Sequence, residues 1–239
     1  LTWTADYLRT HGSESPRLDA EVLLAHACGC QRIDLYTRFN DDSGDDVRTA
    51  FREMVRRRAD AVPVAYLVGH KEFYSLDFRV TPDVLIPRPE TEQLVAMKPK
   101  PEIWARDIAD VGTGSGILAV CAAKHLPQAT VTAIDVSEAA LAIARENAAT
   151  HEVDSRIEFI HGDLLAELPP DASFDFVLSN PPYVSDSEYE SLDRDTTSRL
   201  ERTLRGPVGP SAPMVEVAHH LSQRPRAALL LAPRIRNEF

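Results

Sequence analysis

Cysteine is scarce in this sequence, and neither a long hydrophobic run nor a basic N-terminal segment is present. The chain of 239 residues contains three cysteines, of which Cys28 and Cys30 stand one residue apart. That spacing fits neither a disulfide framework nor a paired-cysteine zinc motif, and His26 nearby leaves the ligand count short, so we expect no metal site. So few cysteines favour a reducing compartment, and we expect the protein in the cytoplasm.

The apolar residues are spread along the chain rather than gathered into one segment. Hydrophobic residues make up 44% of the sequence and charged residues 26%, which is typical of a globular protein. No apolar run approaches the roughly 20 residues that a membrane-spanning helix requires, so no membrane association is expected. Residues Leu1–Asp6 contain no basic side chain and precede no apolar stretch, so no secretory signal is expected either.

The formal net charge of −11 is unevenly distributed. Residues 1–90 carry 12 basic and 15 acidic side chains, residues 91–194 carry 7 and 18, and residues 195–239 carry 7 and 4. A solvated acidic surface accounts for most of these charges. Because the acidic middle part cannot attract a phosphate backbone by releasing counter-ions, we do not expect nucleic acid as the direct substrate.

The first 62 residues have the periodicity of helices. One helix is predicted to begin at Pro16, after Ser15 as N-cap, and to stop at Gly29. Its predicted buried face consists of Leu18, Val22 and Ala25. A second helix is predicted over Asp45–Ala61, and it carries Arg56–Arg58 near its end. We interpret these arginines as a solvated helix terminus, where cations suit the helix dipole, in preference to a nucleic-acid patch.

Between Pro63 and Pro89 the pattern changes to that of strands and turns. Alternation predicts a strand over Phe73–Val80, then a turn at Thr81–Asp83, and a second strand over Val84–Ile86. We therefore predict a β-hairpin linker over residues 71–89, between a helical domain of residues 1–70 and a second domain of residues 90–239.

From about residue 90 onward, predicted helices and strands alternate. The predicted strands, in chain order, are 108–111, 130–134, 157–160, 174–178 and 227–231, and the predicted helices are 117–125 and 137–149. Such alternation is typical of an α/β fold with a parallel sheet and helices on both faces.

A glycine-rich turn, Asp110–Gly116, follows the first of these strands. Ligands bind at the carboxyl end of such a strand in an open parallel sheet. Ile117 stands where a dinucleotide fingerprint needs its third glycine, and no Gly-Lys-Ser/Thr follows as in a phosphate-binding P-loop. A tight turn that needs glycine for positive φ is the simpler alternative.

Two further strands also end in acidic residues, which favours a ligand over a plain turn. Asp135 ends the second strand, where a carboxylate can accept both hydroxyls of a ribose, and Asp163, followed by Leu164, ends the third. These ends meet at one edge of a parallel sheet. A nucleoside without phosphates explains the pattern, and S-adenosylmethionine fits it as the cofactor.

Several motifs resemble those of a known family. The loop Asp110–Gly116, with Gly112, Thr113, Gly114, Ser115 and Gly116, resembles the cofactor loop of class I S-adenosylmethionine-dependent methyltransferases, which have a Rossmann-like sheet. The run Asn180-Pro181-Pro182-Tyr183 resembles the motif of the branch that methylates adenine N6 or glutamine amides. The motifs that resemble release-factor glutamine N5-methyltransferases in particular are Pro16–Leu24, Arg57–Ala59, Pro63–Gly69, Glu72–Tyr74 and Leu85–Glu92.

The resemblance implies an activity and its residues. The target would be the glutamine of the Gly-Gly-Gln motif of peptide chain release factors, recognised by the helical domain. Asn180 and Pro181 would accept hydrogen bonds from the target amide with Tyr183 packed on it, Pro182 would stiffen the motif, and Asn180 would also contact the cofactor. Asp110, the glycine loop, Asp135, Asp163 and Leu164 would bind the cofactor.

The resemblance covers roughly residues 5 to 193, and the last 45 residues depart from the family pattern. Only eight residues follow Leu231, too few for the closing strands of the family. Two other functions stay open at this point, an adenine-N6 methyltransferase acting on nucleic acid and an inactive binding module. We expect the protein to act as a monomer.

Overall fold

The computed structural model describes residues 1–37, 44–87, 91–92, 107–163, 166–169, 172, 174–179 and 228–231. These residues form two compact units. The first comprises Leu1–His70 with Val80–Pro82, and the second comprises Lys71–Arg79 with the described residues from Asp83 onward. Within the described residues, no helix combines the length and the apolar character that crossing a membrane requires.

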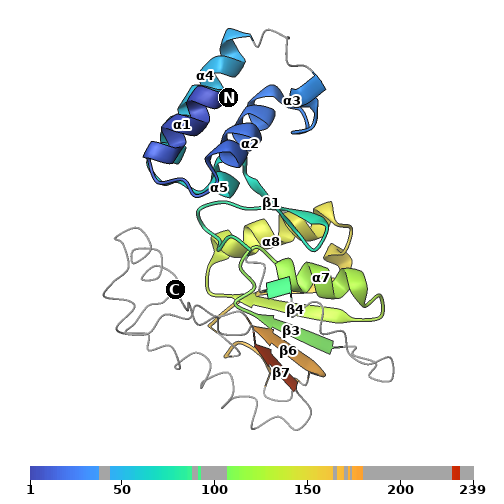
Figure 1. Ribbon diagram of the computed structural model, residues 1–239. Coiled ribbons are helices and arrows are strands. Elements are labelled where there is room, and N and C mark those ends of the chain that lie inside the picture. The colour runs from blue at the N-terminus through green and yellow to red at the C-terminus, as the bar shows by residue number, and fades with distance from the viewer. Residues whose placement is uncertain are drawn as a thin grey trace, which may run out of the picture. The chain divides into compact units, whose positions relative to one another are not determined.

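The first unit consists of helices, as predicted (Figure 1). They are α1 (Thr2–Thr10), α2 (Pro16–Cys28), α3 (Asp34–Thr37), α4 (Asp45–Ala59) and α5 (Val64–Val68). Helix α2 begins at Pro16 and ends at Gly29, whose φ of 61° closes the helix in the left-handed conformation. Ser15 is its N-cap residue, but its side chain makes no capping hydrogen bond.

The predicted buried face of α2 was wrong in part. Leu18 is 45% exposed, whereas Ala20 and Leu23 are fully buried in a core that α1, α4 and α5 complete. Apolar residues occur on several sides of this helix, so periodicity alone does not fix which side faces inward.

The arginine cluster at the end of α4 is only partly solvated. Arg56 is exposed and pairs with Glu53, as expected of a helix terminus. Arg58 instead donates from Nε to Asp19 Oδ2 at 2.8 Å, and the two side chains are 21% and 13% exposed. Ser13 Oγ donates to the same carboxylate oxygen at 2.7 Å, so Asp19 joins α4 to the start of α2.

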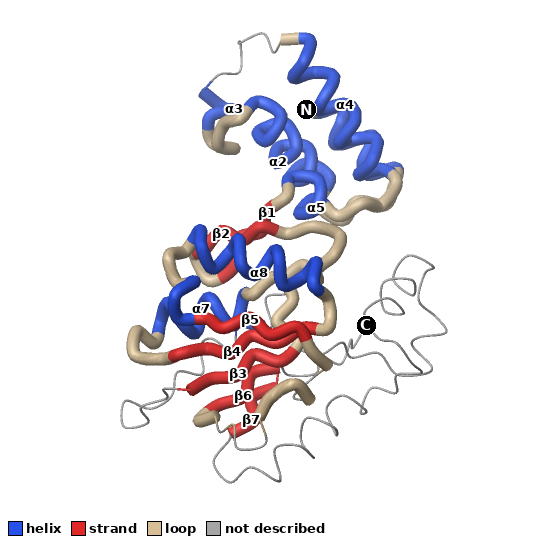
Figure 2. The backbone as a smooth tube through the Cα atoms, turned by 180° about the vertical axis from the view of Figure 1, so that it is seen from behind, coloured by secondary structure: helices blue, strands red, loops and turns tan. Residues whose placement is uncertain are grey.

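The second unit is built on a five-stranded parallel sheet (Figure 2). Its strands are β3 (Asp107–Val111), β4 (Thr130–Asp135), β5 (Ile157–His161), β6 (Phe176–Ser179) and β7 (Ala228–Leu231). They are ordered β5-β4-β3-β6-β7, and every neighbouring pair is parallel. The α/β prediction is therefore confirmed. The strand order, which the sequence pattern did not predict, puts the first strand of the series at the centre.

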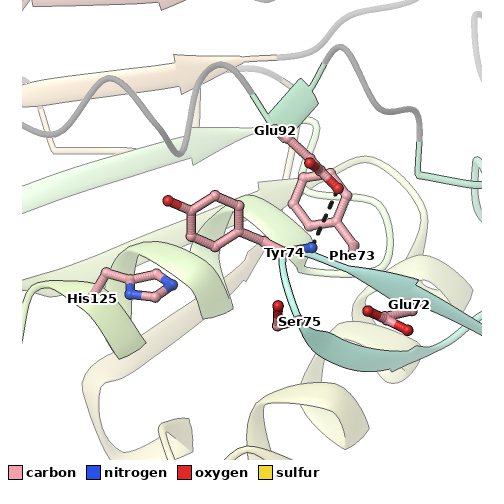
Figure 3. A pocket seen from close by; sticks show the side chains of 6 residues that line it. All are labelled: Glu72, Phe73, Tyr74, Ser75, Glu92 and His125. Atoms are coloured by element: carbon pink, nitrogen blue, oxygen red, sulfur yellow. Dashed lines mark hydrogen bonds between the residues drawn. The ribbon is translucent and has the colours of Figure 1, made fainter.

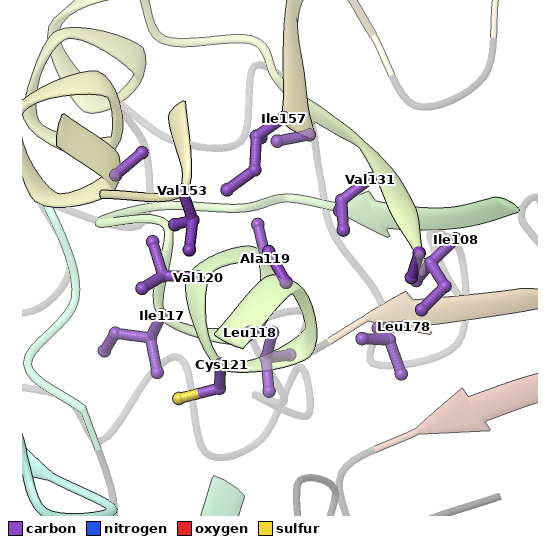
Figure 4. Packing of buried hydrophobic residues seen from close by; sticks show 14 of the residues in the cluster. Ile108, Ile117, Leu118, Ala119, Val120, Cys121, Val131, Val153, Ile157 and Leu178 are labelled. Carbon is purple, nitrogen blue, oxygen red and sulfur yellow. The ribbon is translucent and has the colours of Figure 1, made fainter. Parts of the chain in front are cut away.

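Helices α7 (Ile117–His125) and α8 (Glu138–Thr150) lie over the same face of this sheet (Figures 1 and 2). A 3-10 turn at Asp154–Arg156 leads into β5. Apolar side chains of α7 fill the space above β3 and β4, where Ile108 and Val131 face them (Figure 4). On the opposite face, Leu168 and Phe174 cover Val111 and Val177. The central strands are thus buried on both sides, which is typical of parallel sheets.

Cys121 belongs to this core and takes no part in chemistry. It is fully buried on α7, and burial raises the pKa of its thiol to about 12. Because the thiolate is the reactive form, this cysteine is inert at neutral pH.

The hairpin was predicted in the wrong place. Its strands are β1 (His70–Phe73) and β2 (Leu76–Arg79), joined by Tyr74 and Ser75, and residues 84–86 form no strand. Tyr74 and Ser75 have φ values of 50° and 61°. A two-residue hairpin turn of the primed type requires such positive φ values, and Asn-Gly is its usual sequence. Tyr-Ser lacks that signal, so the alternating pattern predicts one continuous strand across the turn.

We predict that Asp19→Ala destabilises the first unit by about 1–3 kcal/mol, because it leaves the Arg58 guanidinium partly buried without its carboxylate. Urea titration followed by far-UV circular dichroism measures the effect. Asp6→Ala is the matched control, since it removes an exposed ion pair with Arg9 and should leave unfolding nearly unchanged. Equal effects of the two substitutions would contradict the structural role of Asp19.

Candidate functional site

The glycine loop lies at the switch point of the sheet, where strands that follow β3 in the chain are added first on one side of β3 and then on the other. Strand β3 has β4 on one side and β6 on the other, and the loop Gly112–Gly116 follows β3 directly. In open parallel sheets the crevice for ligands lies at this switch point, outside the carboxyl ends of the strands. The described fold therefore places the predicted loop where a ligand site is expected.

The three positions of the loop require glycine for different structural reasons. Gly112, Gly114 and Gly116 all have positive φ, at 73°, 55° and 80°. Among the described residues, a Cβ atom added to Gly112 or Gly114 would meet nothing within 4 Å, so both glycines border open space there. A Cβ atom on Gly116 would lie 2.9 Å from the Cβ of Ala144 on α8. Gly116 is thus required for close packing, and the open space lies at the other two glycines.

Backbone hydrogen bonds fix the start of the loop to the end of β4. The N–H groups of Gly112 and Thr113 both donate to the carbonyl of Ile134, at 2.9 and 3.0 Å. The N–H group of Gly114 donates to Asp135 Oδ2 at 2.8 Å. These bonds tie the first part of the loop to the end of β4.

Asp110, the predicted start of the site, is buried at the end of β3 with 1% exposure. Its Oδ2 accepts from Thr113 Oγ1 at 2.7 Å and from the N–H group of Ala119 at 3.0 Å. Its Oδ1 is buried and has no hydrogen-bond partner among the described residues. Burial, with a smaller contribution from the negative charge of Asp135, raises the pKa of this carboxyl from 3.8 to about 6.

These features fit a positively charged ligand. A buried carboxylate oxygen that lacks a donor is costly unless a ligand supplies one. S-adenosylmethionine carries two cationic groups, a sulfonium and an ammonium, and either would relieve the desolvation of Asp110. The open space at Gly112 and Gly114 gives such a ligand access to the loop backbone.

Asp135 ends β4 next to the loop and is 8% exposed. Its Oδ1 accepts from the N–H group of Ser137 at 2.9 Å, in addition to the Gly114 bond on Oδ2. Ser137 in turn caps α8 by accepting from the N–H group of Ala140. Each carboxylate oxygen can still accept one more hydrogen bond, so the predicted ribose contact is compatible with this arrangement.

Of the remaining predicted site residues, only Asp163 is among those that the structure describes. Asp163 follows the end of β5 and is exposed. Leu164 and the motif of Asn180, Pro181, Pro182 and Tyr183 lie outside the described residues. Ser179, immediately before that motif, is buried in β6, is paired with Val111 in the sheet and donates from Oγ to the Val111 carbonyl at 3.0 Å.

Sequence reasoning missed two residues beside the loop. Val136 follows Asp135 and is 50% exposed, an apolar surface at the same edge of the sheet. Its carbonyl accepts from His161 Nε2 at 2.9 Å, which fixes the backbone there. Asn147 is a fully buried amide on α8. The available signal was a single polar residue within the apolar stripe of an alanine-rich helix.

A hollow of about 480 Å³ in the second unit lies beside the hairpin turn (Figure 3). Its lining residues are Glu72, Phe73, Tyr74, Ser75, Glu92 and His125. The Tyr74 and His125 rings meet edge to face with their centres 5.0 Å apart. None of these residues belongs to the glycine loop or to the acidic strand ends. Among the described residues, no group of three or more His, Cys, Asp or Glu side chains is arranged to hold a metal ion.

Comparison with known proteins identifies the family. A family model described as the PrmC N-terminal domain matches residues 1–69, and one described as the methyltransferase small domain matches residues 90–200. The release factor glutamine methyltransferase of Rhodopirellula baltica is 50% identical over 203 residues, covering 80% of this chain and 67% of that protein. The chain belongs to the release factor glutamine methyltransferase family.

Other members of the family match over a similar extent. The release factor glutamine methyltransferase of Moorella thermoacetica is 41% identical over 201 residues, covering 83% of this chain and 71% of that protein. Among solved structures, the N-terminal domain of human METTL16 in complex with SAH matches with a TM-score of 0.45 and 16% identity, over 67% of this chain and 62% of that one. The methyltransferase small domain contains the glycine loop, Asp135 and the Asn180–Tyr183 motif.

The two kinds of glycine in the loop should respond differently to substitution. Gly114→Ala is expected to cost about 1–2 kcal/mol of unfolding free energy, because its φ is positive but the space is open. Gly116→Ala should cost about 1–3 kcal/mol more, because its Cβ atom clashes with Ala144. Urea titrations of both variants test this. If Gly114→Ala is the less stable protein, the assignment of packing to Gly116 is wrong.

Proposed function

We propose that this chain transfers a methyl group from S-adenosylmethionine to the side-chain amide nitrogen (N5) of the glutamine in the Gly-Gly-Gln motif of peptide chain release factors. The proposal is supported by the buried carboxylate of Asp110, whose Oδ1 has no donor among the described residues, and by the open space that those residues leave at Gly112 and Gly114, in a chain of this family. That combination supplies a cofactor site at the edge where the Asn180–Tyr183 motif follows β6.

In this proposal the cofactor is held along the carboxyl edge of the sheet. Asp110 balances its positive charge, and the backbone of Gly112–Ser115 lies against it. Asp135 accepts the ribose hydroxyls through the lone pairs that Gly114 and Ser137 leave unused. The exposed Val136 offers an apolar surface to the adenine. Asp163 and Leu164 follow the next strand and complete the predicted set. When bound, S-adenosylmethionine supplies an electrophilic methyl group on a sulfonium.

The remaining task of the protein is to orient a poor nucleophile. An amide nitrogen shares its lone pair with the carbonyl, so it must be turned toward the methyl group. We propose that the Asn180 side-chain oxygen and the Pro181 backbone carbonyl accept the two amide N–H groups, and that Tyr183 packs on the amide plane. Pro181 and Pro182 have fixed φ values, which pre-orients these acceptors. Such positioning acts most strongly in the transition state.

We assign recognition of the release factor to the first unit. Every residue proposed to contact the cofactor lies after residue 109, whereas residues 1–69 match the PrmC N-terminal domain. An adenine-N6 methyltransferase is disfavoured by the acidic middle part of the chain and by this N-terminal match. An inactive binding module would keep cofactor affinity without turnover, so a transfer assay separates it.

The direct test is incubation with radiolabelled S-adenosylmethionine and one of three substrates: a release factor, the same factor with its Gly-Gly-Gln glutamine changed to alanine, or RNA. We expect label only in the unchanged release factor. Label in RNA would support the adenine methyltransferase instead, and label in neither would support the inactive module.

Asn180→Ala should lower kcat for release-factor methylation about 10²–10³-fold, by analogy with the loss of one hydrogen-bonding group at an oxyanion site. A kcat equal to that of wild type would contradict the role proposed for Asn180.

Cofactor affinity should depend on the ionisation of Asp110. Burial raises the pKa of this carboxyl from 3.8 to about 6, so the folded chain is more stable when Asp110 is protonated. This contribution to stability is fully present below pH 3.8 and is lost as the pH rises through 6. A cationic ligand prefers the ionised carboxylate, so its affinity follows the opposite trend. Calorimetry with S-adenosylmethionine should show full affinity above pH 7 and a loss approaching tenfold per pH unit below about 6.

Asp110→Asn is the matched control for this pH dependence. Its amide oxygen can keep the bonds from Thr113 and Ala119, but it carries no charge. We expect weaker binding that stays constant between about pH 5 and pH 7. A variant that retains the wild-type pH profile would show that another group titrates.

A further inference from the structure

Asn147 makes three hydrogen bonds to the main chain of two distant segments. Its Nδ2 donates to the carbonyl of Ser115 at 2.8 Å and to the carbonyl of Arg79 at 3.0 Å. Its Oδ1 accepts from the N–H group of Arg79 at 2.7 Å. The side chain is fully buried, and both N–H donors of its amide are used.

The two segments are the glycine loop and the end of the hairpin. Ser115 precedes Gly116 in the loop, and Arg79 is the last residue of β2. Asn147 stands between them on α8, one helical turn after Ala144, the residue that packs against Gly116. Helix α8 therefore contacts the loop at two adjacent points, by packing at Gly116 and by a hydrogen bond at Ser115.

The bond to Ser115 anchors a part of the loop that the strand does not hold. The bonds from Gly112, Thr113 and Gly114 all run to the end of β4, so they fix the first half of the loop. The Ser115 carbonyl is bonded to Asn147, on the side of α8. Without that amide, the second half of the loop would keep its packing at Gly116 and the Gly116 backbone hydrogen bonds to Thr113 and Val120, but it would lose its hydrogen bond to α8.

We propose that Asn147 is a positioning residue that holds the glycine loop in its cofactor-binding conformation and couples it to the β1–β2 hairpin. The role of Asn147 in methyl transfer rests on the proposed function, whereas its coupling of the loop to the hairpin does not. Since one amide bonds both segments, displacing either one disturbs the hydrogen bonds of the other. Coupling of this kind is reciprocal, so a ligand that orders the loop should also order the end of β2.

A neighbouring residue provides a matched control. Glu146 forms an ion pair with the Arg79 side chain, and both side chains are about half exposed. This pair joins the same two elements, β2 and α8, without reaching the loop. Glu146→Ala therefore loosens the hairpin contact at the surface, whereas Asn147→Ala removes the buried bonds to the hairpin and to the loop.

The experiment is amide hydrogen exchange on the full chain, with and without S-adenosylmethionine, for wild type, Asn147→Ala and Glu146→Ala. Without cofactor, Asn147→Ala should accelerate exchange in residues 112–119, and Glu146→Ala should not. In wild type and Glu146→Ala the cofactor should slow exchange at residues 76–79, and in Asn147→Ala this protection should disappear. Should Asn147→Ala fail to fold, Asn147→Ser, which leaves room for a bridging water, replaces it.

Cofactor titration supplies the second readout. We expect the Kd for S-adenosylmethionine to rise about five- to thirtyfold in Asn147→Ala and to stay unchanged in Glu146→Ala. In steady state the loss should appear in the KM for the cofactor, with kcat retained at saturation, because no reacting group is removed.

The outcomes separate this inference from the proposed function. Unchanged exchange at residues 112–119 with unchanged Kd in Asn147→Ala would overturn the positioning role, whatever the methyl acceptor. Absence of hairpin protection in wild type would overturn the coupling. Normal cofactor binding and coupling without label in a release factor would leave this inference standing and reject the proposed function alone.

Discussion

The architecture of the site depends on one buried carboxylate. Asp110 lies at the end of the central strand, where burial makes its ionised form costly enough to raise its pKa to about 6. Its Oδ2 bonds both Thr113 in the glycine loop and Ala119 in the first turns of α7. The same oxygen thus ties the loop to the start of the helix, while the other oxygen is buried and has no hydrogen-bond donor among the described residues.

Around this carboxylate the loop is pre-organised by groups that need no cofactor. The end of β4 holds its first half through Ile134 and Asp135, and α8 holds its second half through Ala144 and Asn147. A ligand that meets a loop already in place loses less free energy to ordering it. The two acidic residues differ in position. Asp110 is buried at the end of the central strand, whereas Asp135 lies at the edge of the sheet, where each of its carboxylate oxygens can accept one more hydrogen bond.

Features of the fold that depend on neighbouring residues were largely predicted from the sequence. Features that depend on contacts between distant residues were not. Helix α7 was predicted with its observed bounds, because Gly116 starts it and the apolar run defines it. The hairpin turn at Tyr74 and Ser75 was missed because its backbone conformation normally calls for Asn-Gly. The strand order, the packing of Gly116 on Ala144 and the bonds of Asn147 depend on residues far apart in the chain, which periodicity does not report. For the Asn180–Tyr183 motif, the family resemblance is the guide.

The burial of Cys121 has a practical consequence for labelling. It lies in the core of the second unit with a thiol pKa of about 12, whereas Cys28 and Cys30, in the first unit, are partly accessible. Thiolate-selective reagents such as maleimides should therefore attach to the native chain at Cys28 and Cys30 and spare the methyltransferase unit. The wild-type sequence thus carries its own attachment point for a fluorophore on the helical unit, with no cysteine to remove from the catalytic one.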